Sequence, residues 1–192
     1  DSIDVEAARR LGIYVYNTPG AFTQPVADTV LGYILAFARR LPWLDRDMKE
    51  SRWSKHLGIS LQESTIGVVG VGAVGQAVVR RGCAFGATLL GNDITEVPGS
   101  FLNETGLQMV SLEELLAQSD FISLNCTLNP TSYHLIGRRQ LRLMKQSAYL
   151  INTCRGPVLE EAALIEALQQ GWIAGAALDV FEEEPLPAGS PL

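Results

Sequence analysis

The chain has 192 residues, of which 47% are hydrophobic and 19% charged, a composition typical of a globular protein with one substantial core. Its 21 acidic and 15 basic side chains give a net charge of −6, which argues against a nucleic-acid partner because phosphate contacts require clustered lysine and arginine. The sequence contains neither a long apolar run nor a signal peptide pattern, so we expect no membrane partner.

The cysteines indicate a reducing environment. Cys83, Cys126 and Cys154 are too widely spaced for a C-x-x-C motif, and their number is odd. This usage disfavours a disulfide framework and a zinc site, so we predict no metal and a cytoplasmic location. The chain begins at Asp1 rather than at a methionine, and we expect it to be a piece of a longer protein.

The first part of the chain predicts two helices with a short strand between them. A short helix over Val5–Leu11, capped by Asp4, is expected to precede a strand at Ile13–Tyr16 and a turn at 17–20. Over residues 24–40 apolar side chains recur at every third or fourth position, which predicts a long amphipathic helix. Its apolar face fits either burial against its own domain or contact with a second subunit.

After a polar linker at 41–55, strands and helices alternate along the chain. Continuous apolar runs are typical of strands buried on both faces of a parallel sheet. The predicted strands are 65–69, 88–90, 121–124, 148–151 and 173–180. The predicted helices are 76–81, 112–118, 138–144 and 160–170. We therefore predict an α/β fold with a doubly wound parallel sheet.

Residues 65–93 carry the strongest functional signal. The first predicted strand leads directly into the G-x-G-x-x-G sequence Gly70-Val71-Gly72-Ala73-Val74-Gly75, and a helix, a second strand and Asp93 follow. Together these features form a dinucleotide-binding fingerprint. Gly70 permits a tight turn, Gly72 lets the backbone approach a pyrophosphate, and Gly75 lets the helix pack closely on the strand.

The groups around this turn would bind the rest of the dinucleotide. Ala73 and Val74 lie at the helix N-terminus, whose free N–H groups and partial positive charge attract phosphate. Asp93 can accept hydrogen bonds from both ribose hydroxyls of an adenosine. Its charge would repel the 2′-phosphate of NADP, and no arginine occurs at 94–96 to receive that group, so we predict NAD as the cofactor.

Further polar residues follow the later strands, and ligands of such sheets bind beyond the carboxyl ends of the strands. Arg155 precedes Gly156-Pro157, and its guanidinium suits bidentate binding of a small carboxylate, with a structural ion pair as the alternative. Asp179 could accept from a carboxamide or cap a loop. The residues expected at this edge of the sheet are Thr127, Thr153, Cys154, Arg155, Asp179 and Glu184.

Other reactive side chains are interpreted as structural. Glu184 precedes a proline and is the best fixed of three glutamates, whereas Glu182 and Glu183 are expected to be solvated. Cys154 has no histidine nearby in sequence, so we interpret it as a small buried residue rather than a nucleophile. The two histidines, at positions 56 and 134, are expected to be surface or capping residues.

These motifs resemble the D-isomer-specific 2-hydroxyacid dehydrogenases, which include phosphoglycerate, glyoxylate, hydroxypyruvate, D-lactate and formate dehydrogenases. The resemblance covers nearly the whole chain, and its N-T-x-R-G segment at 152–156 and L-D-V-F-x-x-E-P segment at 178–185 are specific to the group. It implies a Rossmann-like NAD-binding domain in an oxidoreductase that transfers a hydride between NAD and a small D-2-hydroxy acid or 2-oxo acid.

The resemblance also implies residue roles. Arg155 would bind the substrate carboxylate and polarise the keto group, and Glu184 would pair with a catalytic histidine. Asp179 would contact the nicotinamide carboxamide and Asp93 the ribose, with Thr127, Thr153 and Cys154 completing the cofactor site. The histidine is expected beyond residue 192 and most of the substrate lobe before residue 1, so the chain alone is expected to be inactive. Thr127 and Pro157 replace the family's usual proline and glycine, which leaves the substrate open.

The expected organisation has three parts. Residues 1–23 are interpreted as an edge of the N-terminal substrate lobe, 24–56 as a helix and linker making a dimer or interlobe contact, and 57–192 as the NAD-binding domain. We expect a homodimer. The alternative is an NAD-sensing binding protein, because the stretches 126–129 and 134–136 resemble the C-terminal-binding-protein corepressors of the same family.

Overall fold

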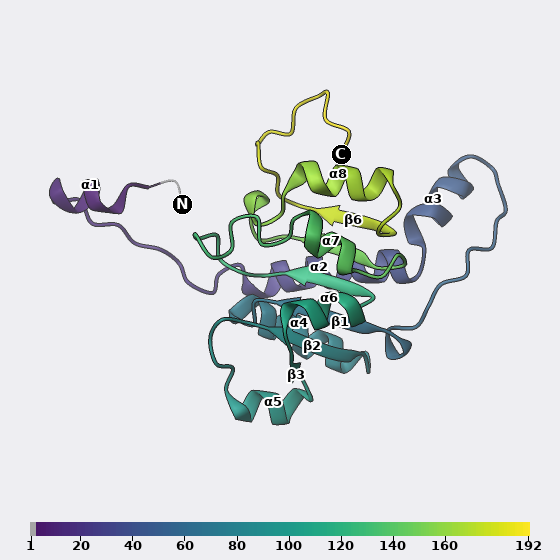
Figure 1. The fold of residues 1–192 in the computed structure, drawn as a ribbon, viewed down its shortest axis with the longest axis horizontal. Coiled ribbons are helices and arrows are strands. Elements are labelled where there is room, and N and C mark those ends of the chain that lie inside the picture. The colour runs from purple at the N-terminus through teal and green to yellow at the C-terminus, as the bar shows by residue number, and fades with distance from the viewer. Residues whose placement is uncertain (1–2) are drawn as a thin grey trace.

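Six parallel strands form one sheet with helices on both faces (Figure 1). The computed structural model describes residues 3–192; Asp1 and Ser2, part of the expected substrate-lobe segment, lie outside the described residues. The strands are β1 (Thr65–Val69), β2 (Thr88–Asn92), β3 (Gln108–Met109), β4 (Phe121–Leu124), β5 (Tyr149–Asn152) and β6 (Gly175–Leu178). The α-helices are α1 (Val5–Arg10), α2 (Thr23–Ala38), α3 (Leu41–Lys49), α4 (Ala73–Ala84), α5 (Gly99–Thr105), α6 (Leu112–Gln118), α7 (Arg138–Leu143) and α8 (Glu161–Gln169).

The strand order β3-β2-β1-β4-β5-β6 confirms the predicted doubly wound sheet. The chain runs outward from β1 through β2 and β3, then returns to the other side of β1 and continues through β4, β5 and β6. The direction therefore reverses between β1 and β4, and Val69 at the end of β1 pairs with Asn92 on one side and Leu124 on the other. The glycine turn that follows β1 lies at this switch point, where doubly wound sheets bind their ligands.

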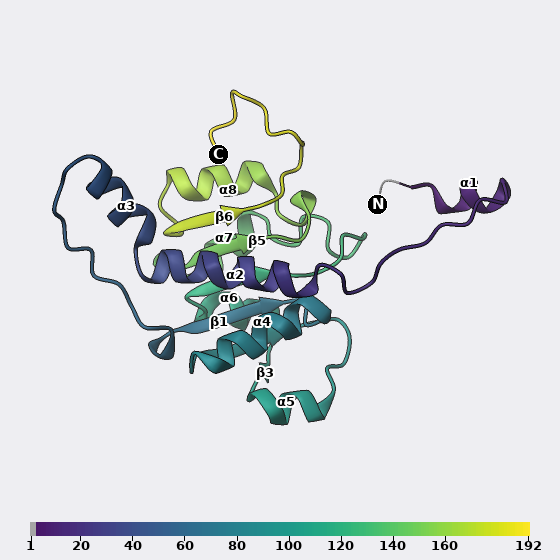
Figure 2. The same ribbon diagram turned by 180° about the vertical axis from the view of Figure 1, so that it is seen from behind.

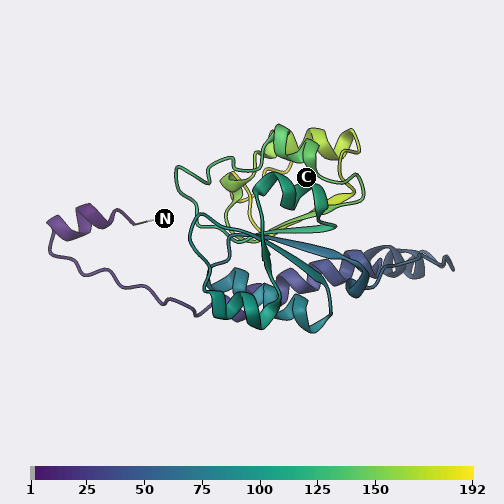
Figure 3. The same cartoon turned by 60° about the horizontal axis from the view of Figure 1, so that its bottom comes forward.

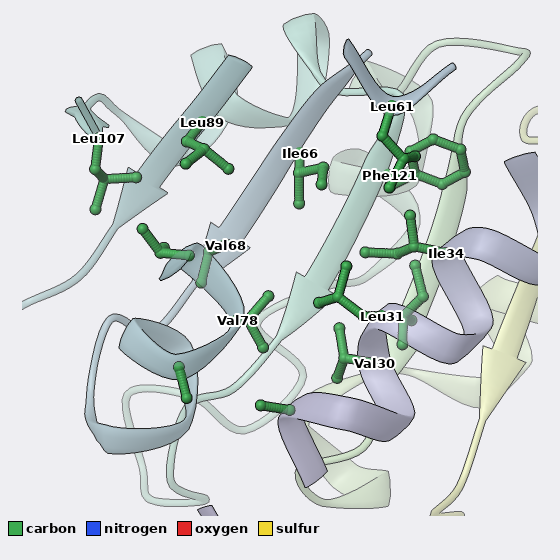
Figure 4. Close-up of a cluster of buried hydrophobic side chains, with 14 of the residues drawn as sticks. Val30, Leu31, Ile34, Leu61, Ile66, Val68, Val78, Leu89, Leu107 and Phe121 are labelled. Carbon is green, nitrogen blue, oxygen red and sulfur yellow. The ribbon is translucent and has the colours of Figure 1, made fainter. Parts of the chain in front are cut away.

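Each face of the sheet has its own hydrophobic core. Adjacent residues of a strand point to opposite faces, so Phe121 of β4 packs with α2 and α4 while Ile122 packs with α6, α7 and α8. Figure 4 shows the first core, in which Ile34 of α2 and Val78 of α4 point toward the strand residues Ile66 and Phe121. Burial on both faces explains why the strands were predictable as continuous apolar runs.

Helix α2 buries its apolar face against its own domain. Val30 and Ile34 are fully buried, and α2 lies along the sheet beside α4 (Figure 2). Phe37 stacks on Tyr149 of β5 with ring centroids 4.3 Å apart. Of the two alternatives that the sequence left open for this face, burial within the domain is the one observed for these residues.

The segment before α2 extends away from the sheet (Figure 3). Asp4 caps α1 as predicted, with its Oδ1 accepting from the N–H of Ala7 at 2.8 Å. The predicted strand at Ile13–Tyr16 is wrong: within residues 3–192 it pairs with no strand, and Tyr14 and Tyr16 are 84% and 86% exposed. A run of apolar, β-prone residues forms a strand only where another strand supplies the hydrogen-bonding ladder.

The remaining differences concern short elements. The expected linker contains α3, which begins with Pro42 in its first turn, where a missing N–H is harmless. Helix α5 was not predicted because, unlike α6 of the same length, it has no side-chain cap at its N-terminus. Strand β3 was not predicted because two residues are too few to show a period. None of the helices formed by residues 3–192 is long and apolar enough to cross a membrane.

Candidate functional site

The glycine turn after β1 is held by close backbone packing. Gly70 has φ +87°, and a Cβ there would lie 2.7 Å from the backbone nitrogen of Cys126. A Cβ at Gly75 would overlap the carbonyl oxygen of Gly70. These two glycines therefore allow a left-handed turn and a close contact between α4 and β1, the structural roles predicted for them.

Gly72 differs because it faces open space. It is solvent-exposed, and a Cβ built on it would meet no atom within 4 Å. The first hydrogen bond of α4 runs from the N–H of Gln76 to the carbonyl of Gly72 at 2.8 Å. The preceding N–H groups, including those of Ala73 and Val74, have no acceptor within the helix. This open helix N-terminus fits the pyrophosphate of a dinucleotide.

Two adjoining cavities line the carboxyl edge of the sheet. The first, of about 300 Å³, is lined by Gly70, Gly72, Asp93 and Thr127 among others. The second, of about 490 Å³, is lined by Val74, Thr127, Thr153, Cys154, Arg155 and Asp179 among others. Both cavities are lined by Asn125, Cys126 and Thr127. They therefore form one continuous surface from Asp93, the candidate for binding ribose, to Arg155, the candidate for binding a carboxylate.

The carboxylate of Asp93 is fixed at the end of β2. Its Oδ2 accepts from the N–H of Val71 at 2.6 Å, and its Oδ1 accepts from the N–H and hydroxyl of Thr95 at 2.8 and 2.7 Å. Partial burial raises the pKa of Asp93, but these donors outweigh it and the pKa lies below its ordinary value. Asp93 is therefore a carboxylate at neutral pH, and it lines the first cavity.

Arg155 and Asp179 are brought together by the loops after β5 and β6. Asp179 extends the β5–β6 ladder, its N–H donating to the carbonyl of Asn152 at 3.0 Å. A Cβ at Gly156 would overlap the carbonyl of Phe181, so the two loops touch there. Arg155 is exposed, and its Nη1 donates to the carbonyl of Cys154 at 2.6 Å. A cation and a carboxylate thus share the second cavity.

The structure gives less direct support for two of the predicted site residues, Glu184 and Thr153. Glu184 is exposed and does not line either cavity; its Oε1 accepts from the N–H of Phe181 at 3.0 Å, on the loop that packs against Gly156. Thr153 lines the second cavity, and its buried hydroxyl has no hydrogen-bond partner among the described residues. An unsatisfied hydroxyl at this position fits a ligand that supplies a polar group.

Glu182 is exposed, as the sequence indicated, but it also makes specific contacts. It pairs with His134 at 2.7 Å and accepts from the N–H of Glu161 at 3.3 Å. His56 pairs at 2.8 Å with the buried Asp47, whose pKa is held well below its usual range by hydrogen bonds from His56 and Arg52. Neither histidine lines either of the two cavities at the sheet edge.

The sequence missed several residues of the first cavity. Asn129, Thr131 and Ser132 form a hydrogen-bonded turn in which Asn129 Oδ1 accepts from the N–H of Thr131 at 2.8 Å. The Asn-Pro-Thr-Ser sequence predicts such a turn, but its position against the glycine turn follows only from the folded sheet.

The comparisons with known proteins agree with this geometry. Residues 31–192 match the family model described as "D-isomer specific 2-hydroxyacid dehydrogenase, NAD binding domain". A glyoxylate reductase from Korarchaeum cryptofilum is 46% identical over 100% of this chain and 59% of its own length. A D-3-phosphoglycerate dehydrogenase from Methanocaldococcus jannaschii is 44% identical over 100% of this chain and 37% of its own length.

A solved structure of D-lactate dehydrogenase from Aquifex aeolicus, complexed with NAD and lactic acid, superimposes with a TM-score of 0.88. It is 35% identical and covers 95% of this chain and 55% of that one. The chain thus spans at most about three fifths of these relatives. The family match covers most of the chain, and it confirms both the predicted fold and the predicted cofactor. The chain therefore belongs to the D-isomer specific 2-hydroxyacid dehydrogenases and contains their NAD-binding domain.

Proposed function

We propose that the complete protein transfers a hydride between NAD and a small 2-oxo acid, with glyoxylate as the first candidate. The observation that carries the proposal is the shared cavity of Arg155 and Asp179, which adjoins the glycine turn. A guanidinium there suits a carboxylate substrate, and a carboxylate there suits the amide of a nicotinamide. The relatives named glyoxylate reductase support the substrate class.

The residue roles follow from these positions. Bound NAD supplies the hydride chemistry. Arg155 would hold the substrate carboxylate and stabilise negative charge on the keto oxygen. Asp179 would accept from the carboxamide, and Thr153 and Thr127 would border the same group. Glu184 would raise the pKa of a histidine that moves the proton, because a nearby carboxylate favours the charged imidazolium.

A substrate panel tests the proposed reaction. The complete protein would be mixed with NADH and glyoxylate, hydroxypyruvate, pyruvate or a longer 2-oxo acid, and the loss of NADH absorbance followed. We expect turnover of at least one small 2-oxo acid, and in the reverse direction oxidation of D- but not L-2-hydroxy acids. Tight NAD binding without turnover of any of these acids would contradict the proposal and favour an NAD-sensing binding protein.

Asp93 is expected to make the protein prefer NAD to NADP. Contact between its carboxylate and a 2′-phosphate places like charges together, which costs several kcal/mol, or at least about a hundredfold in Kd. Because the pKa of Asp93 is lowered, the charge is present at neutral pH and is lost only as pH falls through that low pKa. Because the second pKa of a phosphate monoester is about 6, the preference should be constant between about pH 7.5 and pH 9, where both groups are fully charged.

Calorimetry with both nucleotides would measure this preference. The matched variants are Asp93→Asn, which keeps an oxygen for the N–H of Thr95 but removes the charge, and Asp93→Ala. Both should erode the preference, mainly by strengthening NADP binding in Asp93→Asn. Equal affinity for NAD and NADP in the parent protein would show that Asp93 does not face the ribose.

We also propose a cytoplasmic homodimer to which residues 24–56 contribute. The cytoplasmic location rests on the odd number and wide spacing of the cysteines, which suit a reducing compartment. The buried face of α2 no longer supports the dimer, so the proposal rests on α3 and the segment after it, where Met48 is 59% and Trp53 83% exposed. Large exposed side chains are common at two-fold contacts.

Light scattering at micromolar concentration should report a dimer for the parent protein. The double variant Met48→Ser and Trp53→Ser should shift it toward monomer, because both apolar side chains would lose their contacts. Tyr133→Ser, which removes another exposed aromatic (59%), is the control and should remain dimeric. A monomeric parent would refute the dimer.

A further inference from the structure

Cys126 and Cys154 follow the ends of two neighbouring strands at equivalent positions. In the β4–β5 ladder Leu124 is paired with Asn152, and each cysteine lies two positions beyond its member of that pair. Neighbouring strands are about 4.8 Å apart, and the Cα atoms of a disulfide are about 4.4–6.8 Å apart, so side chains that follow two paired strand ends can come within reach of one another. Cys126 and Cys154 line the same cavity, and each thiol shifts the pKa of the other.

This pair lies inside the site rather than beside it. Both cysteines are half-buried and line the cavity that contains Arg155, and Cys126 lines the first cavity as well. The backbone of Cys126 abuts Gly70, where a Cβ would lie 2.7 Å from the Cys126 nitrogen. The carbonyl of Cys154 accepts from Arg155. Cys126 therefore contacts the glycine turn and Cys154 contacts Arg155, so a bond between the two cysteines would link these two parts of the site.

The environment gives the two thiols different reactivities. Interaction with the neighbouring Cys154 thiol, which outweighs burial, lowers the pKa of Cys126 below its ordinary value. The same interaction and burial raise the pKa of Cys154. Asn152 fixes Cys154 as well, because its Oδ1 accepts from the N–H of Cys154 at 3.1 Å and lies 3.1 Å from the Cys154 sulfur. Cys126 is thus the attacking thiolate and Cys154 the resolving thiol.

We propose that Cys126 and Cys154 form a reversible thiol–disulfide pair whose oxidation weakens NAD binding. The pair is a redox site of the cofactor pocket, so its effect on affinity rests on the proposed cofactor residues. The oxidant is a low-molecular-weight disulfide of the glutathione type. Disulfides in a reducing compartment are usually transient and redox-sensing, which agrees with the free thiols of this structure.

The reaction is two successive exchanges. The Cys126 thiolate attacks one sulfur of glutathione disulfide, forming a mixed disulfide and releasing one glutathione thiolate, which takes up a proton. The Cys154 thiol then loses its proton and attacks the sulfur of Cys126, forming the Cys126–Cys154 bond and releasing the second glutathione. The protein loses two electrons and two protons, and one glutathione disulfide becomes two thiols.

Oxidation and NAD binding must oppose one another. Forming the bond brings the two sulfurs to a covalent distance of about 2.05 Å inside the cavity, and it ties the Cys126 backbone, which abuts Gly70, to the loop that carries Arg155. If the disulfide weakens NAD binding, thermodynamic linkage requires that bound NAD protect the thiols by the same factor. Both effects are measurable without any substrate.

The test uses the complete protein with Cys83→Ser, which removes the exposed cysteine of α4 and should behave like the parent. After equilibration with oxidised and reduced glutathione, intact mass should show the loss of two hydrogen atoms, and peptide mapping should find Cys126 linked to Cys154. Calorimetry should give a Kd for NAD at least about tenfold weaker for the oxidised form. Dithiothreitol should reverse the change, and saturating NAD should oppose it.

Single variants separate the two thiols. Cys154→Ser should stop at a stable glutathione adduct on Cys126, whereas Cys126→Ser should react slowly at Cys154 because that thiol is rarely ionised. Absence of the Cys126–Cys154 link, or an oxidised form with unchanged NAD affinity, would overturn the proposal. A protein that forms the link and loses NAD affinity but reduces no 2-oxo acid would instead overturn only the proposed reaction.

Discussion

Replacement of Arg155 by alanine is expected to lower kcat/KM for 2-oxo acids by at least about a thousandfold, because removing one preorganised donor to a developing oxyanion costs about 10²–10³ in kcat alone. Loss of the carboxylate contact should raise KM in addition. Arg155 is the cationic member of the described residues that line the second cavity, so no neighbour there replaces its charge. The Kd of NAD should change by less than about tenfold.

Two further variants make this result specific. Arg155→Lys keeps a positive charge but loses the planar fork that binds a carboxylate through two parallel hydrogen bonds, so its activity should lie between the parent and Arg155→Ala. Arg139→Ala is the control, since that side chain is 76% exposed and reaches Glu113 only at 3.5 Å. Steady-state kinetics of all three variants give the comparison. If kcat/KM for Arg155→Ala fell by less than about tenfold, Arg155 would not be the residue that binds the substrate carboxylate.

The parallel sheet was predictable because its strands are buried on both faces. The apolar run at 121–124 became β4 with unchanged bounds, and the G-x-G-x-x-G sequence fell at the switch point. Strand β3 gave no such signal, because Gln108 and Met109 are both exposed and the element has only two residues. The apolar pattern at Ile13–Tyr16 was misleading since periodicity does not show whether a strand has a partner.

The site was predictable to the extent that it depends on strand ends. In a parallel sheet all carboxyl ends meet at one edge, which is why Thr127, Arg155 and Asp179 gather in one cavity. Contacts across the sheet were not predictable in this way. The pairing of Cys126 with Cys154 depends on the register of β4 against β5, and the pairing of His134 with Glu182 depends on how two loops meet.

Alanine substitutions at Gly72 and Gly75 are expected to differ in their effects: the first should weaken NAD binding, and the second should lower the stability of the domain. Gly72→Ala should leave the thermal unfolding midpoint close to that of the parent, because the added methyl group meets no atom within 4 Å and the backbone at φ −73° suits any L-residue. The same methyl group occupies the surface on which a pyrophosphate would lie. Losing one charge-assisted hydrogen bond costs about 1.5–3 kcal/mol, so NAD should bind about ten- to a hundredfold more weakly.

Gly75→Ala is the matched variant with the opposite outcome. Its methyl group would overlap the carbonyl oxygen of Gly70, so α4 must move away from β1. The free energy of unfolding of the domain should fall by about 1–3 kcal/mol. Thermal unfolding without nucleotide measures that loss, and calorimetry measures NAD affinity for both variants below their unfolding midpoints. If Gly72→Ala bound NAD as tightly as the parent, the dinucleotide would not cross Gly72. Because this substitution should spare the fold, such a result would count against the position of the cofactor and not against the structure of the turn.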